Sequence, residues 1–186
     1  MDVDQATPAD MVILFTDIHD YSSVVKELGQ AGRSPAQFIQ EVYRETGEAV
    51  MEQGGAILQY HGDGILCTFP GGCEGNAVRC ALDMRRAYAR VVGRWHIAHD
   101  TELEVGISAG KVQVGLVGHP SMQQKGLFGL AVFAAAVIGH HRGIALTEGV
   151  YQAIKDAYPT RRLPDRQVGW QDEPLKVWEI AAGASG

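Results

Sequence analysis

The chain contains the stretch Gln59-Tyr60-His61-Gly62-Asp63-Gly64-Ile65-Leu66-Cys67-Thr68-Phe69, which predicts a β-hairpin closed by a tight Gly-Asp-Gly turn. The turn places Asp63 at the edge of an apolar strand. Another apolar, β-prone run with a single aspartate comes earlier, at Met11-Val12-Ile13-Leu14-Phe15-Thr16-Asp17-Ile18. We expect these strands to be neighbours in one sheet, so that the carboxylates of Asp17 and Asp63 meet at the strand tips.

Two carboxylates at close range repel each other unless a cation lies between them. Mg²⁺ typically binds through one or two carboxylates together with the phosphates of a substrate. The pair of Asp17 and Asp63 therefore predicts metal-assisted phosphate chemistry. The alternative is that Asp63 only serves the turn and Asp17 only ends a strand, which is the commoner role for either residue alone.

Two short motifs surround the aspartates: Phe15-Thr16-Asp17-Ile18 followed by Tyr21-Ser22, and Gly62-Asp63 before an apolar strand. Apolar segments follow at 103–112, 114–118, 143–147 and 173–180. This ordered set resembles the catalytic domain of the class III adenylate/guanylate cyclases, in which such segments form a central hairpin, a late strand and a closing strand. The resemblance implies an α+β fold with a ferredoxin-like βαββαβ core, in which helices pack on a central, mostly antiparallel sheet.

The resemblance covers residues 11–180, which we expect to form one cyclase homology domain between an N-terminal tail, 1–10, and a disordered tail, 181–186. Hydrophobic periodicity and turn residues predict the elements of this domain. They are a strand at 11–18, helices at 22–28 and 34–53, hairpin strands at 56–60 and 65–69, a helix at 77–90 and an apolar helix at 127–138. The resemblance implies, in addition, a central hairpin at 103–117 and strands at 143–147 and 173–180.

Length and composition indicate a soluble globular protein of one domain. The chain has 186 residues, of which 46% are hydrophobic and 20% are charged. A formal net charge of -6 argues against a nucleic-acid partner, because such a partner requires a concentrated basic face. Three cysteines, an odd number without paired metal-ligand spacing, predict reduced thiols and a cytoplasmic location. The longest apolar run, 127–139, is too short for a membrane segment, which takes about 20 residues.

The resemblance implies a reaction in which the ribose 3'-hydroxyl of a nucleoside triphosphate attacks the α-phosphorus and pyrophosphate leaves. Two Mg²⁺ or Mn²⁺ ions would activate the hydroxyl and neutralise the leaving group. Asp17 and Asp63 match the two metal-binding aspartates of the family, and the Ile18 carbonyl is an expected further ligand. Backbone N–H groups of the turn Asp20-Tyr21-Ser22 are expected to face the phosphates. Asp20 stands where the family often has glycine, and its alternative role is a helix cap.

The residues that the family uses to bind the base and ribose and to stabilise the transition state are replaced in this chain. Gln59 and Gly126 stand at the two base-reading positions. Phe133 stands at the position of the ribose-orienting Asn, and Val137 at that of the transition-state Arg. Loss of one preorganised charge-stabilising donor costs about 10²- to 10³-fold in rate. We therefore expect weak or no activity from a homodimer, and an apolar helix over 127–138 that is buried in a core or a subunit interface.

Three functional hypotheses follow, because the family's site lies between two cyclase domains. A homodimer would be a regulatory module that binds metal, nucleotide, or an apolar ligand in a pocket around Phe128, Phe133 and Val137. A heterodimer with an unlike cyclase domain that supplies Asn and Arg would be an active enzyme. A homodimeric cyclase with unusual substrate recognition is the third, with Lys125 and Arg142 as the nearest candidate cations.

The histidines could suggest a separate metal site, but their pattern argues against one. His140 and His141 are adjacent and therefore point in different directions on any regular element. No His-Glu-x-x-His or Cys-x-x-Cys pattern accompanies them. We expect scattered histidines that each have a hydrogen-bond partner of their own; the others considered are His61, His96, His99 and His119.

Overall fold

The structure, a computed structural model, describes residues 7–181, so the predicted tails at 1–10 and 181–186 lie mostly outside the described residues. Within the described part, eight strands form one sheet: β1 (Thr7–Ile18), β2 (Ala56–His61), β3 (Gly64–Pro70), β4 (Leu103–His119), β5 (Met122–Phe128), β6 (Ile144–Thr147), β7 (Thr160–Arg162) and β8 (Val177–Ile180). The strand order is β2-β3-β1-β4-β6-β8-β7, and β5 pairs with β4. Only the β4–β6 pair is parallel among these strand pairs of the described chain.

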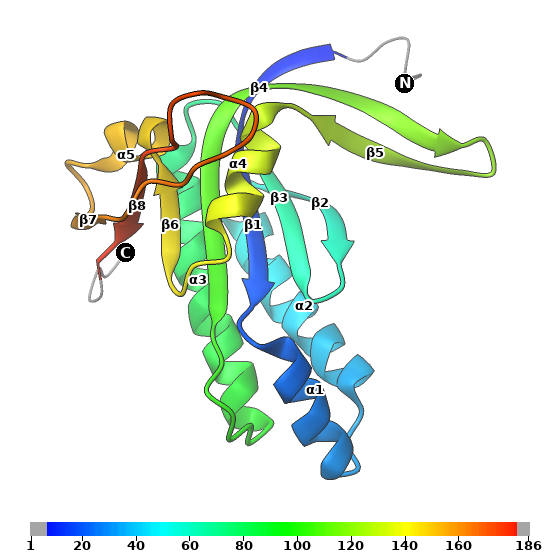
Figure 1. Ribbon diagram of the computed structural model, residues 1–186. Coiled ribbons are helices and arrows are strands. Elements are labelled where there is room, and N and C mark those ends of the chain that lie inside the picture. Colours follow the sequence, from blue (N-terminus) through cyan, green and yellow to red (C-terminus); the bar gives the residue numbers. More distant parts are fainter. Residues whose placement is uncertain (1–6, 182–186) are drawn as a thin grey trace.

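Helices cover both faces of this sheet (Figure 1). The helices are α1 (Tyr21–Gln30), α2 (Pro35–Glu52), α3 (Glu74–Arg94), α4 (Leu130–Ile138) and α5 (Glu148–Ile154). α2 and α3 pack against each other on one face, whereas α4 lies on the other face against β4 and β1 (Figure 1). The predicted α+β fold, with helices packed on a mostly antiparallel central sheet, is confirmed.

β1 is the central strand on which both layers are built. It pairs antiparallel with β3 on one side and with β4 on the other. Val12 and Leu14 pack in the core that includes α2 and α3, whereas Ile13 packs with Ala135 of α4. This alternation is the two-residue period of a strand that is buried on both faces. The predicted central strand is confirmed, although it begins four residues earlier, because 7–10 also pair with β4.

The central hairpin predicted within 103–117 is wrong. β4 is one unbroken strand of 17 residues, and the chain reverses only at its end. Pro120 and Ser121 form the turn, and Gly118, just before it, has a positive φ of 125° while still paired with Gln123 of β5. Gly115, an earlier glycine, does not end the strand, because it pairs with Gly126 of β5.

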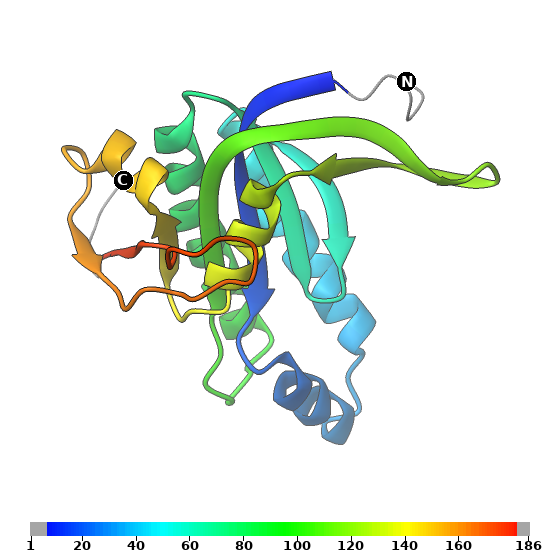
Figure 2. The same cartoon turned by 45° about the horizontal axis from the view of Figure 1, so that its top comes forward.

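β4 and β5 leave the body of the sheet together as a two-stranded arm, residues 113–128 (Figure 2). The apolar helix predicted over 127–138 is correspondingly shorter, because its first residues belong to β5 and α4 begins at Leu130. Near the tip of the arm, Met122 exposes 78% of its surface. The arm therefore presents strand and apolar surface beyond the core of the domain.

α4 packs directly on the backbone of β4 at Gly106. A Cβ atom at this position would lie 2.1 Å from the Ala135 carbonyl oxygen and 2.6 Å from the backbone nitrogen of Gly139. No side chain larger than that of glycine fits between strand and helix here. This close contact fixes the position of α4, and with it Phe133 and Val137, relative to the sheet.

Candidate functional site

The turn that carries Asp63 is fastened to the end of β1. The backbone N–H of Ile18 donates to Oδ2 of Asp63 at 3.2 Å, and the backbone N–H of Ile65 donates to Oγ1 of the buried Thr16 at 3.0 Å. A Cβ atom on Gly64 would lie 2.3 Å from the Thr16 carbonyl oxygen, so only glycine permits this approach. The backbone of the turn therefore holds the Asp63 carboxylate at the carboxyl end of β1.

Asp17 and Asp63 form a carboxylate pair at this end of the strand. Burial raises the pKa of Asp63, and the nearby charge of Asp17 raises it further. Burial also raises the pKa of Tyr21 at the start of α1, and the charge of Asp63 adds to this rise. The donor set of two carboxylates fits a hard cation such as Mg²⁺, which would relieve their repulsion. The pair thus suits the metal half of the site that the sequence predicts, with the Ile18 carbonyl still a predicted ligand.

Replacing Asp63 with Asn should stabilise the metal-free protein at about pH 7. The folded state raises the pKa of Asp63, so folding favours the protonated carboxyl. The stability that the carboxyl contributes is present below its unfolded pKa and is lost as the pH rises through its folded pKa. The gain in stability of the variant over the wild type should therefore disappear below about pH 4, where the Asp63 carboxyl of the wild type is protonated in both the folded and the unfolded state. Thermal unfolding in EDTA across this pH range measures the difference.

Divalent metal provides the control for the Asp63→Asn prediction. At about 100 times the dissociation constant, Mn²⁺ should stabilise the wild type by about 2.7 kcal/mol and the variant by much less. A variant that is less stable than the wild type at neutral pH without metal would contradict this account of the pair.

Asp20 follows β1 with a positive φ of 49° and occupies the N-cap position of α1. Its position at the start of α1 fits the predicted alternative of a helix cap, although its side chain makes no capping hydrogen bond. Instead, its carboxylate accepts from the Ser22 hydroxyl at 3.1 Å and lies 2.9 Å from Nε2 of His99. Hydrogen bonds from Ser23, Ser22 and His99 lower the pKa of Asp20. The turn predicted to face phosphate, where Tyr21 and Ser22 begin α1, therefore carries a charged carboxylate.

Two residues lie beside Asp17: Glu104, which the sequence pattern does not single out, and His140, for which it argues against a metal site. Glu104 is buried and stands directly opposite Asp17 in the pairing of β1 with β4. His140 follows α4, and its Nδ1 lies 3.1 Å from Oδ2 of Asp17. One ligand atom of each of the three residues lies within 4.8 Å of the other two. Knowledge of the β1–β4 register would have identified Glu104, but the register depends on contacts far apart in the sequence.

The predicted separate partners of the histidines are found: Gln59 for His61, Asp20 for His99 and Ser121 for His119. Nε2 of His141 lies 2.7 Å from Oε2 of Glu179, so His140 and His141 do point in different directions. His140 has a partner of its own, Asp17, as expected, and His19 lies beside the same cluster. Nδ1 of His19 lies 2.8 Å from Oε1 of Glu104. The cluster therefore contains two carboxylates and two imidazoles within hydrogen-bonding reach.

The two predicted base-reading positions lie close together, where β2 meets the arm. Nε2 of Gln59 donates to the Lys125 carbonyl oxygen at 3.4 Å, and its Oε1 lies 2.8 Å from Nε2 of His61. Gly126 follows in β5, where a Cβ atom would lie 2.7 Å from the Phe128 ring. The Gln59 amide is thus engaged within the chain, and Gly126 has no room for a side chain without movement of that ring.

α4 has a small-residue side that packs on the sheet and a large apolar side that faces away from it. Ala135 and Ile138 are buried, whereas Phe133 exposes 58% and Val137 exposes 37% of its surface. This side of the helix is therefore not buried in the core of the chain, contrary to one of the two predicted environments. We refer to four exposed residues as the apolar face: Phe128, Leu130, Phe133 and Val137.

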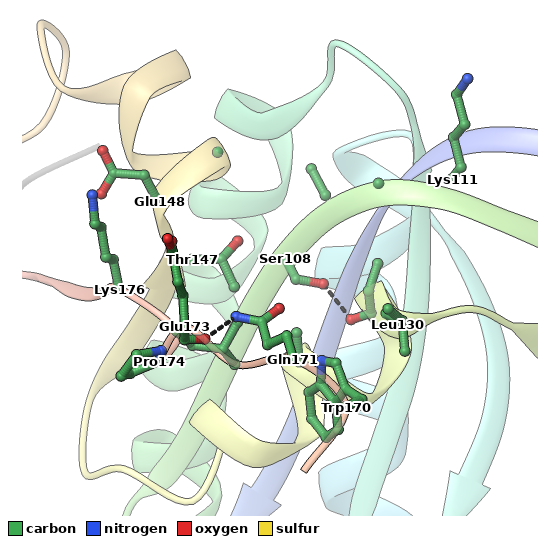
Figure 3. Close-up of a pocket in the computed structure, with 16 residues that line it drawn as sticks. Ser108, Lys111, Leu130, Thr147, Glu148, Trp170, Gln171, Glu173, Pro174 and Lys176 are labelled. Carbon is green, nitrogen blue, oxygen red and sulfur yellow. Dashed lines mark hydrogen bonds between the residues drawn. The ribbon is translucent and has the colours of Figure 1, made fainter. Parts of the chain in front are cut away.

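A cavity of about 490 Å³ lies on the other flank of α4, between this helix, the start of α5 and the segment 170–176 (Figure 3). Its lining includes Leu130, Ser108 and Trp170 but neither member of the carboxylate pair. The Trp170 ring lies 6.0 Å from the ring of Phe133. The predicted pocket around the apolar face is instead an open surface, and a separate cavity lies beside it.

Arg142, one of the two candidate cations, is paired within its own chain. Its guanidinium binds Glu102 at 2.7 Å and both oxygens of Asp100 at 3.0 Å. These carboxylates raise the pKa of Arg142, with Asp100 the larger contributor. The Arg142 guanidinium is therefore engaged by carboxylates of its own chain.

The sequence and the fold of this chain are similar to those of known proteins. Residues 3–169 match the family described as the adenylate and guanylate cyclase catalytic domain. An adenylate cyclase from Anabaena cylindrica is 26% identical over 197 residues, which cover 98% of this chain. This chain spans 39% of the length of that relative. Within residues 7–181, every helix is too short or too polar to cross a lipid bilayer.

Solved structures share the fold at low sequence identity. The adenylyl cyclase CyaB from P. aeruginosa has a TM-score of 0.86 at 19% identity, with 97% of each chain covered. The guanylate cyclase domain of RhGC from Catenaria anguillulae, in complex with GTP, has a TM-score of 0.76 at 18% identity, covering 95% of this chain and 99% of that domain. At these identities the likeness supports the fold alone.

Proposed function

Because this chain belongs to the adenylate and guanylate cyclase catalytic domain family, we propose that it binds a nucleoside triphosphate with Mg²⁺ or Mn²⁺ but cyclises it weakly or not at all as a homodimer. In this role it is a regulatory module of nucleotide signalling in the cytoplasm. The carboxylate pair supports metal binding, and the apolar face of α4 supports impaired turnover.

Asp17 and Asp63 would hold the metal, with the Ile18 carbonyl as a further ligand. Bound there, one or two divalent ions would lower the pKa of the ribose hydroxyl and neutralise the leaving pyrophosphate. Tyr21 and Ser22 would meet the phosphates through backbone N–H groups at the first turn of α1. The Asp20 carboxylate, held at the same turn by Ser22, adds negative charge and should weaken this phosphate contact.

The exposure of Phe133 and Val137 on α4 is the observation that carries the proposal. The resembled enzymes use these positions to orient the ribose and to stabilise charge on the α-phosphate. A phenyl ring and an isopropyl group neither hydrogen-bond a hydroxyl nor compensate a negative charge. Since each lost donor costs about 10²- to 10³-fold in rate, two losses in one site remove most of the catalytic advantage.

The apolar face also indicates a protein partner. It exposes several large apolar side chains on one helix and the adjoining strand, and contiguous apolar surface of this kind marks interaction sites. Burial of such surface contributes about 25 cal/mol per Å². We propose that the apolar face packs against another cyclase domain, either a second copy of this chain or an unlike domain.

Turnover and binding measured on one purified preparation test the proposal. Light scattering first establishes that the chain is a dimer. With Mn²⁺ and each of the four ribonucleoside triphosphates, product should form at least about 10²-fold more slowly than with an active cyclase domain assayed in parallel. Calorimetry should still detect binding of the Mn²⁺–triphosphate, which Asp17→Asn should abolish. Rapid formation of cyclic product, or failure to bind Mn²⁺, would overturn the proposal.

A heterodimeric enzyme is the second candidate function, favoured by the intact carboxylate pair and by the exposed apolar face. The decisive partner is a cyclase domain that keeps its Asn and Arg but has both metal-binding aspartates replaced by Asn. Mixed with this chain, it should form cyclic product only if Asp17 and Asp63 supply the metal site. Activity that survives Asp63→Asn in this chain, or no activity from any such mixture, would leave the regulatory module as the better description.

A further inference from the structure

We propose that Asp17, Glu104 and His140 form a second cation site, which binds a transition metal such as Zn²⁺ in preference to Mg²⁺. The inference rests on the proposed function in one respect, since Asp17 also belongs to the carboxylate pair. Glu104 and His140 have no part in that pair, so the two sites overlap at a single residue.

Three separate elements bring the ligand atoms together. Asp17 of β1 and Glu104 of β4 are directly opposite in the antiparallel ladder, and His140 follows α4, whose position is fixed at Gly106. One ligand atom of each lies within 4.8 Å of the others, and the His140 Nδ1 is 3.1 Å from Asp17 Oδ2. Zinc bonds of about 2.0–2.2 Å require ligand atoms roughly 3–3.5 Å apart. Small side-chain rotations therefore suffice to close the cluster around one ion.

Glu104 gives the site a buried carboxylate, since only 7% of its side chain is exposed. Burial of a carboxylate is unfavourable unless a hydrogen bond, an opposite charge or a metal compensates it. His19 holds one oxygen, with Nδ1 at 2.8 Å from Oε1. Carboxylates that bind metals are commonly oriented by such neighbours. His19 therefore compensates the burial of the Glu104 carboxylate and restricts its orientation.

His140 forms the open side of the cluster. Its side chain is 59% exposed, but its ring packs edge-on against Phe15, with centroids 6.0 Å apart and planes at 68°. The aromatic contact restricts the orientation of the imidazole. The exposure leaves a coordination position for water or an incoming ligand, as in zinc sites with three protein ligands.

The imidazole determines which metal the second site prefers. Mg²⁺ takes oxygen ligands and keeps several waters, whereas Zn²⁺ readily accepts nitrogen and oxygen in sets of three protein ligands. The pair of Asp17 and Asp63 offers only carboxylate oxygens. The set that contains Glu104 and His140 adds a nitrogen. Zn²⁺ at the second site therefore competes with Mn²⁺ or Mg²⁺ for Asp17.

Zn²⁺ binding by the full chain tests the inference. Calorimetry with a competing chelator gives the affinity and stoichiometry, and the visible absorption of Co²⁺ reports the ligand environment. We expect one Zn²⁺ per chain, with affinity at least about 10-fold weaker in His140→Gln and in Glu104→Gln. The matched control is His141→Gln, which replaces the adjacent histidine that binds Glu179 and should leave Zn²⁺ affinity unchanged.

Asp63→Asn separates this inference from the proposed function. The variant should lose Mn²⁺–triphosphate binding and keep Zn²⁺ binding, whereas Asp17→Asn should lose both. Because His140 is mostly exposed, His140→Gln should fold normally even if Glu104→Gln does not, and circular dichroism checks this. Unchanged Zn²⁺ affinity in His140→Gln, or Zn²⁺ binding that disappears with Asp63, would overturn the second site while leaving the nucleotide proposal intact.

Discussion

The double variant Phe133→Asn, Val137→Arg should form cyclic nucleotide at least about 10²-fold faster than the wild-type homodimer. The substitutions place an amide and a guanidinium where the resembled enzymes orient the ribose and stabilise the transition state. Both positions are exposed, at 58% and 37%, so the new side chains disrupt little of the core. The carboxylate pair of the facing domain would supply the metal ligands. Chromatography of reactions with Mn²⁺ and each triphosphate measures product.

Two further variants control this experiment. Leu130→Asn also places an amide on an exposed position of α4, 55% exposed, but not at a position that the family uses, and it should give no gain. Asp63→Asn added to the double variant should remove the gained activity. A double variant that binds the Mn²⁺–triphosphate but is no faster than the wild type would show that the apolar side chains of α4 are not what limits turnover.

Gly106→Ala should lower the free energy of unfolding by about 3 kcal/mol, because overpacking at a rigid contact forces backbone to move. The added Cβ would lie 2.1 Å from the Ala135 carbonyl oxygen, and a backbone atom cannot rotate away as a side chain can. We expect α4 to shift off the sheet. Chemical denaturation measures the loss, and fluorescence of Trp170, which lies near Phe133, reports the displacement of α4.

Gly93→Ala is the matched control for this prediction. Gly93 is exposed in α3, and a Cβ atom there would meet nothing within 4 Å. Alanine favours helix over glycine by up to about 1 kcal/mol, so this variant should be neutral or more stable. Equal stability of Gly106→Ala and the wild type would contradict the close contact between β4 and α4.

Local signals made part of the fold predictable. The side chain of Ser34 accepts from the Gln37 backbone N–H at 3.3 Å, and Pro35 occupies the first position of α2, as the sequence indicates. The proximity of Asp17 and Asp63 follows similarly from turn chemistry and from the pairing of two neighbouring apolar strands. In each case residues close in sequence, or one strand pairing, determine the outcome.

Other features depend on contacts that no local pattern contains. An apolar run with glycines fits either a hairpin or one long strand, and for β4 the pairing with β1 and β5 decides. His140 is 123 residues from Asp17, so their contact requires the whole order of strands. The composition of α4 likewise does not reveal which of its apolar sides, that of Ala135 or that of Phe133, faces the sheet.

The continuity of β4 connects the arm directly to the end of the sheet where Asp17 lies. At about 3.3 Å per residue, a strand of 17 residues extends roughly 50 Å, from Glu104 beside Asp17 to the tip of the arm. Its ladder with β1 runs from Thr7 to Ile18, which resists sliding. A neighbouring domain that tilts the arm would therefore act on the same strand that carries the buried Glu104 carboxylate beside Asp17.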